Sequence, residues 1–335
     1  MYNKKYNYLK EKEKMRIMKK MINTVHIEGR IYAHDLVIKQ VSNPQSANLG
    51  KDFISGNLEI AVDEDGLNVI PVHFTYVTAE TKSGAKSPTY SALEKIINEN
   101  KTWTTVGKDN AEKIQVNTAV ALNDFYNQND ELVSAKRAEG GFISSIRELK
   151  ADETQRNTFD TDMLITNVKR VEANEEKGTP EYVEVSGAIF NFRNDLMPVQ
   201  YTINDKAGMD YFEGLGATGA NPVFTRVWGN INCKTKTVTN EIESAFGEPA
   251  VRTYNRTERE WLISGAPKQA YDFGDEKILT ADEVRKAAQD REVMLADIKR
   301  RNDEYKAQKA AGNVAAAATP TAQPSAPVAT GGFTF

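Results

Sequence analysis

Aromatic and basic side chains alternate with apolar ones in residues 223–234, and their chemistry suits contacts with bases and phosphates. Strand alternation predicts two faces for this segment. One face carries Val223, Thr225, Val227 and Ile231. The other carries Phe224, Arg226, Trp228 and Lys234. The predicted partner strand adds Arg252, Tyr254 and Arg256, and the connection adds Lys236. Exposed rings that stack on bases, beside cations that meet phosphates, are what binding of a nucleic-acid strand requires.

A second interpretation of this hairpin is structural. Aromatic and arginine side chains also pair across strands on solvated faces, including through cation–π contacts. We favour binding, because basic and aromatic residues recur at successive outward positions of both strands. Further candidates in the same half are Tyr182, Phe192 and Arg193, although Phe190 or Phe192 could instead close the end of the core.

The N-terminal half offers a thinner set of candidates for the same chemistry. These are Arg30, Tyr32, Phe53, His73, Lys113, Tyr126, Lys136 and Arg137. Trp103 follows a predicted helix, and we interpret it as a packing anchor rather than a stacking platform.

Other site chemistries find little support, so we expect no catalytic residues, no cofactor and no metal. The glycines of residues 214–219 follow a predicted helix and precede a strand, whereas a dinucleotide fingerprint follows a strand and opens a helix. Residues 63–66 lack the later ligands of a calcium loop. The three histidines are scattered and have no carboxylate or thiol partner that would complete a metal site. An enzyme is therefore not expected.

The elements that position these side chains are predicted to be mainly strands. Alternating apolar residues predict strands at 21–32, 54–62 and 69–77, then a helix at 88–100, then strands at 113–126 and 131–146. The order returns with strands at 162–170, 182–192 and 197–203, a helix at 205–215, and strands at 223–238 and 251–263. Three strands, a helix and a hairpin are the element order of an OB-fold, a five-stranded Greek-key barrel. We therefore predict a mainly β chain with two OB-fold barrels in tandem.

Composition agrees with two domains and limits the environment. A chain of 335 residues gives a prior of about two domains. The net charge of -4 neither supports nor excludes nucleic acid, because a groove can be locally basic. The single cysteine excludes an intramolecular disulfide, and no window approaches ~18 consecutive apolar residues. We expect a cytoplasmic protein that does not enter membranes.

The predicted domains leave several connecting and terminal segments. We assign 1–20 to a basic flexible arm, 21–147 to the first barrel, 148–160 to a linker and 161–275 to the second barrel. Residues 276–311 contain a helix opened by a capping-box pattern at 280–283, and 312–335 form a low-complexity flexible tail. Met21 is an alternative start, because nothing before it patterns with the fold.

The last residues of the tail carry two aromatic side chains, Phe333 and Phe335. Aromatic side chains at the end of a flexible spacer bury nothing in their own core, so either they are incidental or another surface receives them. Capture of an extended backbone with its terminal carboxylate is a recurring mode of peptide recognition. We favour a docking tip for a partner protein.

The stretch 21–30, Met-Ile-Asn-Thr-Val-His-Ile-Glu-Gly-Arg, resembles the start of bacterial and bacteriophage single-stranded DNA-binding proteins. The order of barrel, low-complexity spacer and Phe-bearing terminus is similar too. The resemblance implies an OB-fold that coats single-stranded DNA in replication, recombination or repair, with a tail that recruits replication or recombination proteins. It also implies that Phe335 matches the family's terminal Phe. The family's tail is normally acidic, whereas 312–335 carries no charged side chain.

The leading hypothesis is thus sequence-tolerant binding of single-stranded DNA without catalysis, with homo-oligomers left open. One alternative is a structural or scaffolding protein whose barrels bind protein. Another is an RNA-binding OB protein, because OB-folds accept either polymer. Salt dependence distinguishes nucleic-acid binding from scaffolding, since phosphate contacts weaken steeply with salt.

Overall fold

Strands make up most of the structure, and they fall into two units. The computed structural model describes residues 21–81, 83–174, 180–242, 250–273, 275 and 278–310. The first unit comprises Val25–Thr158, Ile231–Glu260 and the chain from Lys299. The second comprises Phe159–Asn230 and Trp261–Ile298, with the chain up to Thr24. The predicted arm at 1–20, the tail at 312–335 with Phe333 and Phe335, and the side chain of Arg252 lie outside the described residues.

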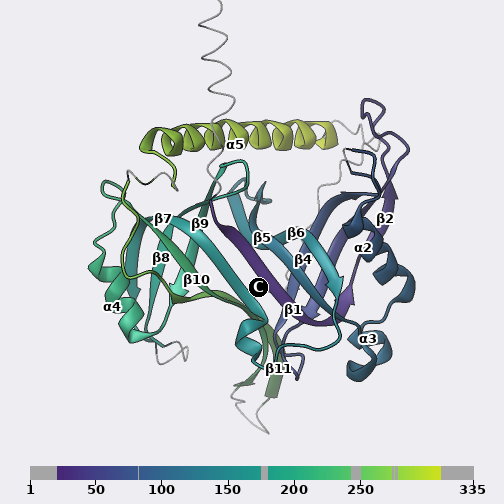
Figure 1. Ribbon diagram of the computed structural model, residues 1–335, viewed down its shortest axis with the longest axis horizontal. Helices are drawn as coiled ribbons and strands as arrows, with labels where there is room; N and C mark the ends of the chain where they lie inside the picture. Colours follow the sequence, from purple (N-terminus) through teal and green to yellow (C-terminus); the bar gives the residue numbers. More distant parts are fainter. Residues whose placement is uncertain are drawn as a thin grey trace, which may run out of the picture. The chain divides into compact units, whose positions relative to one another are not determined.

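Six strands and two α-helices lie wholly or mainly in the first unit, and Figure 1 labels all of them except β3. Its strands are β1 (Asn23–His34), β2 (Val37–Gln40), β3 (Asp52–Ala61), β4 (Val69–Thr78), β5 (Lys113–Tyr126) and β6 (Leu132–Ser145). Its helices are α2 (Pro88–Glu99) and α3 (Trp103–Val106), with short 3-10 turns at Lys108–Asn110 and Glu153–Gln155. Strands β1, β3, β4, β5 and β6 and helix α2 match the predicted elements within a few residues. The short β2 and α3 were not predicted.

Several strands of the first unit pair with strands that are not their neighbours in the chain. β1 is antiparallel to both β3 and β5. β6 is antiparallel to β5 and parallel to β4, and β4 is antiparallel to β3. Alternation drives this arrangement, because every second residue of β4 from Ile70 to Phe74 is buried. Gly29 lets β1 approach β3, since a Cβ there would lie 2.1 Å from the carbonyl oxygen of Ala61.

Helix α2 lies between β4 and β5 in the chain, and local signals fix both of its ends. The Ser87 side chain accepts a hydrogen bond from the Tyr90 backbone N–H, and Pro88 occupies the first turn. Asn100 ends the helix in the left-handed conformation, with φ of 47°. Tyr90, Leu93 and Ile96 are buried at helical spacing on one face.

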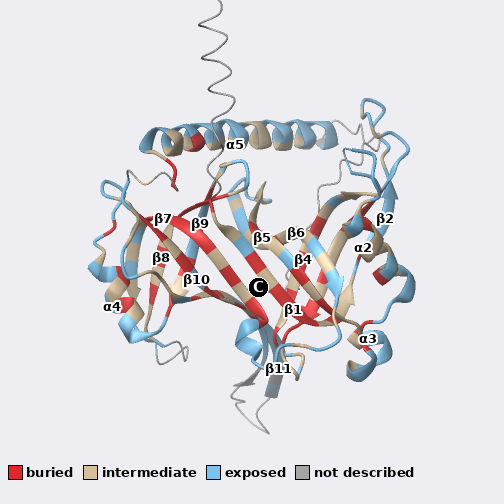
Figure 2. Cartoon of the chain, viewed as in Figure 1, coloured by how far each residue is buried: buried red, intermediate tan, exposed pale blue. Residues whose placement is uncertain are grey.

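The second unit repeats the order of elements. It contains β7 (Asn157–Val171), β8 (Tyr182–Phe190), β9 (Leu196–Ile203), α4 (Lys206–Gly214), β10 (Val223–Ile242) and β11 (Ala250–Gly265). β8 is antiparallel to β7 and β9, and β11 runs parallel to β9 where Leu262 pairs with Thr202. β10 neighbours β11 and also pairs with β7. Figure 2 shows the buried residues concentrated on the strands.

Helix α5 (Ala281–Ala310) follows the strands, and its first turns belong to the second unit. The predicted capping box is present, because the Glu283 carboxylate accepts hydrogen bonds from the Thr280 backbone and hydroxyl. Ala287 and the preceding Ile278 and Leu279 join the buried cluster around Phe190 and Phe224. Most of α5 is exposed (Figure 2). Among the described residues, no helix is both long enough and apolar enough to cross a membrane.

The β10–β11 hairpin contributes to both units. Its base, up to Asn230 and from Trp261, belongs to the second unit, whereas its outer part, Ile231–Glu260, belongs to the first. We call residues 231–260 the outer hairpin. The sequence predicts a linker at 148–160 and assigns all of 161–275 to the second barrel. The structure groups residues 231–260 with the first unit.

Candidate nucleic-acid interface

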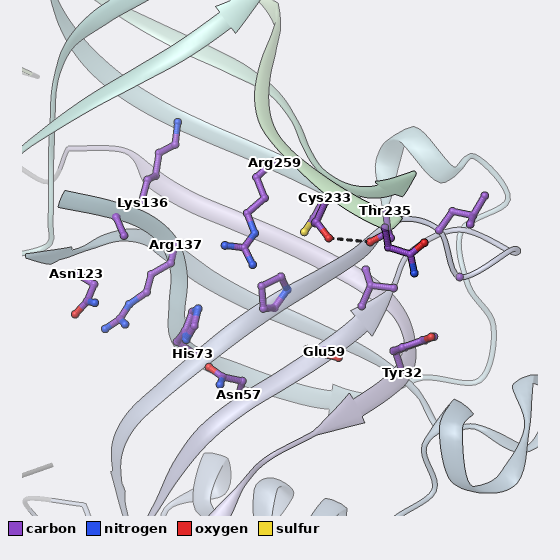
Figure 3. A pocket seen from close by; sticks show the side chains of 17 residues that line it. Tyr32, Asn57, Glu59, His73, Asn123, Lys136, Arg137, Cys233, Thr235 and Arg259 are labelled. Atoms are coloured by element: carbon purple, nitrogen blue, oxygen red, sulfur yellow. Dashed lines mark hydrogen bonds between the residues drawn. The ribbon is translucent and has the colours of Figure 1, made fainter. Parts of the chain in front are cut away.

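A cavity of about 460 Å³ lies in the first unit, and its lining comes from several strands. β3 contributes Asn57 and Glu59, β4 contributes His73, and β6 contributes Lys136 and Arg137. The outer hairpin supplies further lining residues: Cys233, Thr235, Asn255, Thr257 and Arg259. Tyr32 from β1 completes one side (Figure 3). Of the predicted binding residues, the cavity brings together Tyr32, His73, Lys136 and Arg137.

The outer hairpin presents its odd-numbered residues to this cavity. The predicted binding residues of the hairpin, Lys234, Lys236, Tyr254 and Arg256, have the opposite parity and do not line it. They remain exposed, and Tyr254 is 41% exposed. The Lys236 ammonium lies 2.7 Å from the Glu258 carboxylate, so part of this face is neutralised. The outer hairpin therefore has two polar faces, one toward the cavity and one toward solvent. The sequence predicted binding residues only on the solvent face.

Asn68 attaches the outer hairpin to the turn between β3 and β4. This buried amide accepts a hydrogen bond from the Cys233 backbone N–H at 2.8 Å. The Thr235 backbone N–H donates to the Leu67 carbonyl at 3.1 Å. Nearer the base of the hairpin, the Asn157 amide donates to the Ile231 carbonyl at 2.7 Å. These contacts hold the hairpin wall of the cavity in place.

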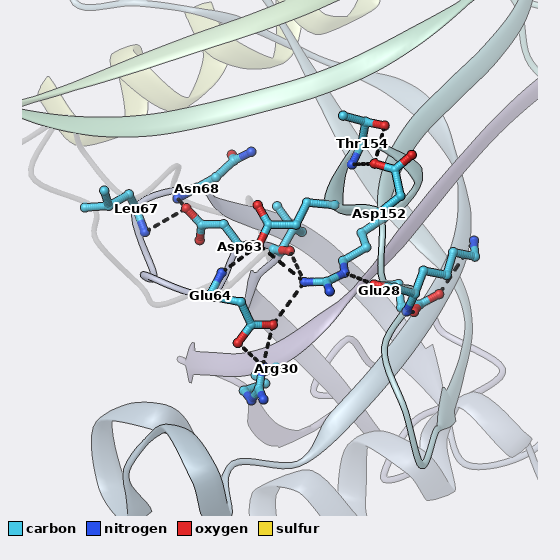
Figure 4. A network of polar contacts seen from close by, with 12 residues as sticks. Glu28, Arg30, Asp63, Glu64, Leu67, Asn68, Asp152 and Thr154 are labelled. Atoms are coloured by element: carbon cyan, nitrogen blue, oxygen red, sulfur yellow. Dashed lines mark hydrogen bonds and ion pairs between the residues drawn. The ribbon is translucent and has the colours of Figure 1, made fainter.

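A network of polar contacts that includes Arg30, Asp63 and Glu64 supports the same turn (Figure 4). The buried Arg156 guanidinium donates to the carbonyl oxygens of Lys150 at 2.6 Å and Val62 at 3.0 Å, and it lies 3.3 Å from Glu64. The Asp63 carboxylate accepts from the backbone N–H groups of Leu67 and Asn68. Predicted residue Arg30 belongs to this network, because its guanidinium lies 3.2 Å from Glu64. Its side chain is only 12% exposed, so its contacts are structural.

Basic groups outnumber acidic ones in the cavity. Arg137 contacts Glu139 at 2.8 Å, and burial lowers the pKa of Lys136 to about 7. Burial, followed by the charge of Arg137, lowers the pKa of His73 to about 4, so this imidazole is neutral at pH 7. Burial raises the pKa of the Glu59 carboxyl, and Arg259 opposes that shift. Such a cavity favours an anionic ligand, because an added negative charge stabilises the protonated Lys136 and both guanidinium groups.

Phe224 and Phe53 are buried, and the prediction that they contact nucleic acid from an exposed face is wrong. Phe224 is fully buried because the segment after β11 covers that side of β10, so its ring packs 6.1 Å from Phe190 and 6.2 Å from Tyr271. Phe53 is 4% exposed because the ring of Tyr76 lies 4.7 Å away on the neighbouring strand. The exposed aromatic at that place is Tyr76, at 42%.

Two exposed groups in the second unit keep the predicted character. Phe192 is 74% exposed in the turn between β8 and β9, and the Arg193 guanidinium lies 5.0 Å from its ring centre. Trp228 is 38% exposed. Its ring leaves no room for a side chain at Gly265, where a Cβ would lie 2.5 Å from the indole nitrogen. Both aromatics offer faces on which a base could stack.

Several predicted contacts are engaged with other residues or half-buried. The Arg226 guanidinium is paired with the Asp160 carboxylate, its Nε donating at 2.7 Å. The Lys113 ammonium donates to the Arg147 carbonyl at 3.4 Å. The Tyr126 ring lies 5.0 Å from the Lys299 ammonium. Tyr182 is half-buried.

Trp103 and the glycine loop at 214–219 behave as interpreted from the sequence. Trp103 packs 5.9 Å from Tyr32, behind the cavity. The glycine loop follows α4 and precedes β10, the reverse of the order that a dinucleotide site needs. Within the described parts of the chain, no group of three or more His, Cys, Asp or Glu side chains is placed to hold a metal ion.

Sequence reasoning missed Arg259, Asn57 and the other side chains that complete the cavity. Arg259 lies between Glu258 and Glu260, a charge run that is typical of a solvated face. The local signal for these residues is the alternation along the outer hairpin. Thr235, Asn255 and Thr257 stand between the predicted basic and aromatic residues, so they point to the opposite face.

Comparisons with known proteins find a matching family and solved structures with a similar fold. A deletion mutant of the single-stranded DNA binding protein from Thermus aquaticus aligns with a TM-score of 0.44 and 12% sequence identity, covering 77% of this chain and 100% of that chain. No curated protein matches the sequence. The family model YorF matches residues 21–301, which include both units and most of α5. The chain belongs to the YorF family.

Proposed function

We propose that the protein binds single-stranded DNA without regard to sequence over most of the contact, and without catalysis. The observation that carries this proposal is the cavity of the first unit, which is lined by Lys136, Arg137 and Arg259 as well as by the ring of Tyr32. Cations for phosphates and a ring for stacking are the two requirements of single-strand binding. The faces of β3 and β4 are also where an OB-fold binds oligonucleotides.

The proposal includes the fold and the wider binding path. We propose that each unit is an OB-fold barrel, supported by the pairing of β1 with both β3 and β5 and of β7 with both β8 and β10. Exposed aromatic and basic side chains extend the path in each unit, taken separately. In the first unit they are Lys234, Lys236, Tyr254 and Arg256. In the second they are Phe192, Arg193 and Trp228.

The biological setting is part of the same proposal. Coating of single strands serves replication, recombination or repair, and the resemblance of residues 21–30 to single-stranded DNA-binding proteins supports that setting. The aromatic residues Phe333 and Phe335 would then recruit a replication or recombination protein to the coated strand.

A titration with labelled oligo-dT tests the proposal by fluorescence anisotropy, with duplex DNA and oligo-U as competitors. We expect tight binding of oligo-dT, weak competition by duplex, and weaker binding by the double variant Trp228→Ala, Tyr254→Ala. Arg285→Met is a matched control, because Arg285 is 68% exposed on α5 and far in sequence from either strand face. Absence of binding at low salt would overturn the proposal, and preference for oligo-U would replace DNA by RNA.

A further inference from the structure

The size of the cavity in the first unit matches a single small ligand. Its volume of about 460 Å³ falls within the range of roughly 300–1,000 Å³ that small-molecule sites occupy. One wall is formed by β3, β4 and β6, and the facing wall is the outer hairpin. A cavity of this size has room for one small ligand, so its ligand is more restricted than that of the exposed binding path.

The cavity has two chemically different sides. In Figure 3, Lys136 and Arg137 lie together on one side, Arg259 projects into the middle, and Tyr32 lies on the opposite side. Arg137, Arg259 and His73 all line this cavity. A nucleotide has the same division, with an anionic phosphate at one end and a flat base at the other.

Side chains that donate and accept hydrogen bonds also line the cavity. Asn57 and Asn255 carry amides, and Thr235 and Thr257 carry hydroxyls that lie 3.1 Å apart. An amide offers both donor and acceptor atoms, as does a hydroxyl. Because the four bases differ in their donors and acceptors, such a lining discriminates among them in a way that stacking alone does not.

We propose that this cavity receives one nucleotide, with phosphate oxygens between Arg137 and Arg259 and the base directed toward Tyr32. The nucleotide arrives either as one residue of a bound strand or as a free nucleoside monophosphate, and the two sources share this chemistry. For the strand-borne form the inference rests on the single-strand binding proposed above. It adds that the cavity selects the base at one position, whereas contacts elsewhere along the strand tolerate any base.

Cys233 provides a direct readout of occupancy. It is the only cysteine of the chain, it lines the cavity and it is 6% exposed. The rate at which a thiol reagent labels Cys233 is measured in the full chain with and without ligand. The ligands are the four deoxynucleoside monophosphates, oligo-dT and inorganic phosphate. At a ligand concentration of about ten times Kd, occupancy reduces the rate about tenfold if labelling requires an empty cavity.

Arg259→Met tests the phosphate contact, and Arg285→Met again serves as the control. The measured quantity is the ratio of labelling rates with and without ligand, because Arg259 itself influences the Cys233 thiol. We expect the protection ratio to fall toward one in Arg259→Met and to stay unchanged in Arg285→Met. Arg259 is an exposed residue, so its replacement leaves the fold intact.

The outcomes separate this inference from the proposed function. Protection by oligo-dT alone identifies the strand as the source, and protection by a monophosphate alone identifies the free nucleotide; both support the inference. If oligo-dT binds by anisotropy but neither it nor any monophosphate protects Cys233, the inference fails and single-strand binding stands. Equal protection by inorganic phosphate also overturns it, because the cavity would then be an anion site only. If monophosphates protect but oligo-dT does not bind, single-strand binding fails and the nucleotide site stands.

Discussion

Lys136 is the side chain whose charge depends most on the cavity. Burial lowers its pKa to about 7, because the charged ammonium group is less well solvated in the folded chain than in water. In the unfolded chain the same group titrates near its ordinary value of 10.5. Between these two values the unfolded state binds a proton that the native state lacks. The free energy of unfolding therefore rises with pH through this window, and the cost of burying the charge is fully present below it.

Lys136→Met is expected to remove this pH dependence. Wild-type stability, relative to the variant, should increase by about 2 kcal/mol between pH 7 and pH 9, since each pKa unit is worth about 1.4 kcal/mol. Urea denaturation at a series of pH values measures the difference. The comparison between the two proteins cancels other groups that titrate in the same window. Parallel stability curves for the two proteins would show that Lys136 keeps its ordinary pKa.

Arg156 shows the opposite case, a charge that is buried but fully engaged. Arg156→Ala removes the donor from the carbonyl oxygens of Lys150 and Val62 and leaves Glu64 with fewer partners. A buried acceptor that loses its donor costs about 1–3 kcal/mol. We expect a destabilisation of roughly 3 kcal/mol by urea denaturation. Arg285→Ala, which breaks only an exposed pair with Asp282, should cost less than about 0.5 kcal/mol. Similar losses in both variants would contradict the structural role of Arg156.

Among the elements, the outer hairpin determines the site, and Asn68 is its main attachment. Asn68→Ala removes the acceptor of the Cys233 N–H and also an amide that lies 3.5 Å from the Asn232 side chain. A lost hydrogen bond of this kind costs roughly 0.5–1.5 kcal/mol. If labelling of Cys233 requires the hairpin to open, its rate should increase up to about tenfold, because 1.4 kcal/mol corresponds to a factor of ten. Asn191→Ala, in the turn between β8 and β9, is the control and should not change the rate.

The order of the elements could be predicted from the sequence because burial in these strands follows the period of the pleat. Burial alternates along β9 and along the first half of β4, and Asp-Gly and Asn-rich turns mark the hairpins. The same rule failed at Phe224, where residues 278 and 279 cover the side of β10 that alternation leaves outside. No local pattern reveals such a covering segment.

The cavity itself could be predicted only in part. Tyr32, His73, Lys136 and Arg137 were identified because basic and aromatic residues stand out on predicted strands. Arg259 was missed because the packing of the outer hairpin against β3, β4 and β6 is a tertiary contact between distant parts of the sequence. Periodicity gives the two faces of a strand but does not say which face meets another element.

At the scale of the whole molecule, charge is distributed unevenly. The chain carries a net charge of -4, yet the cavity lining contains Lys136, Arg137 and Arg259 against one carboxylate, Glu59. An acidic surface repels nucleic acid in general, whereas a local positive potential attracts phosphates to one place. This distribution favours a binding mode with few ionic contacts, in which stacking and enclosure supply the remaining affinity.

The salt dependence of oligo-dT binding tests that distribution. If the three cavity cations neutralise about three phosphates, log K should fall with log salt with a slope near -2, which is about a twentyfold loss between 50 and 200 mM. Removing one cation by Arg259→Met should make the slope shallower by about 0.7, and Arg285→Met should leave it unchanged. Anisotropy titrations at four or more salt concentrations provide the slopes. A much steeper wild-type slope would mean that additional cations, such as those on the exposed face of the outer hairpin, carry most of the phosphate contacts. A slope that Arg259→Met does not alter would remove the cavity from the path of the strand.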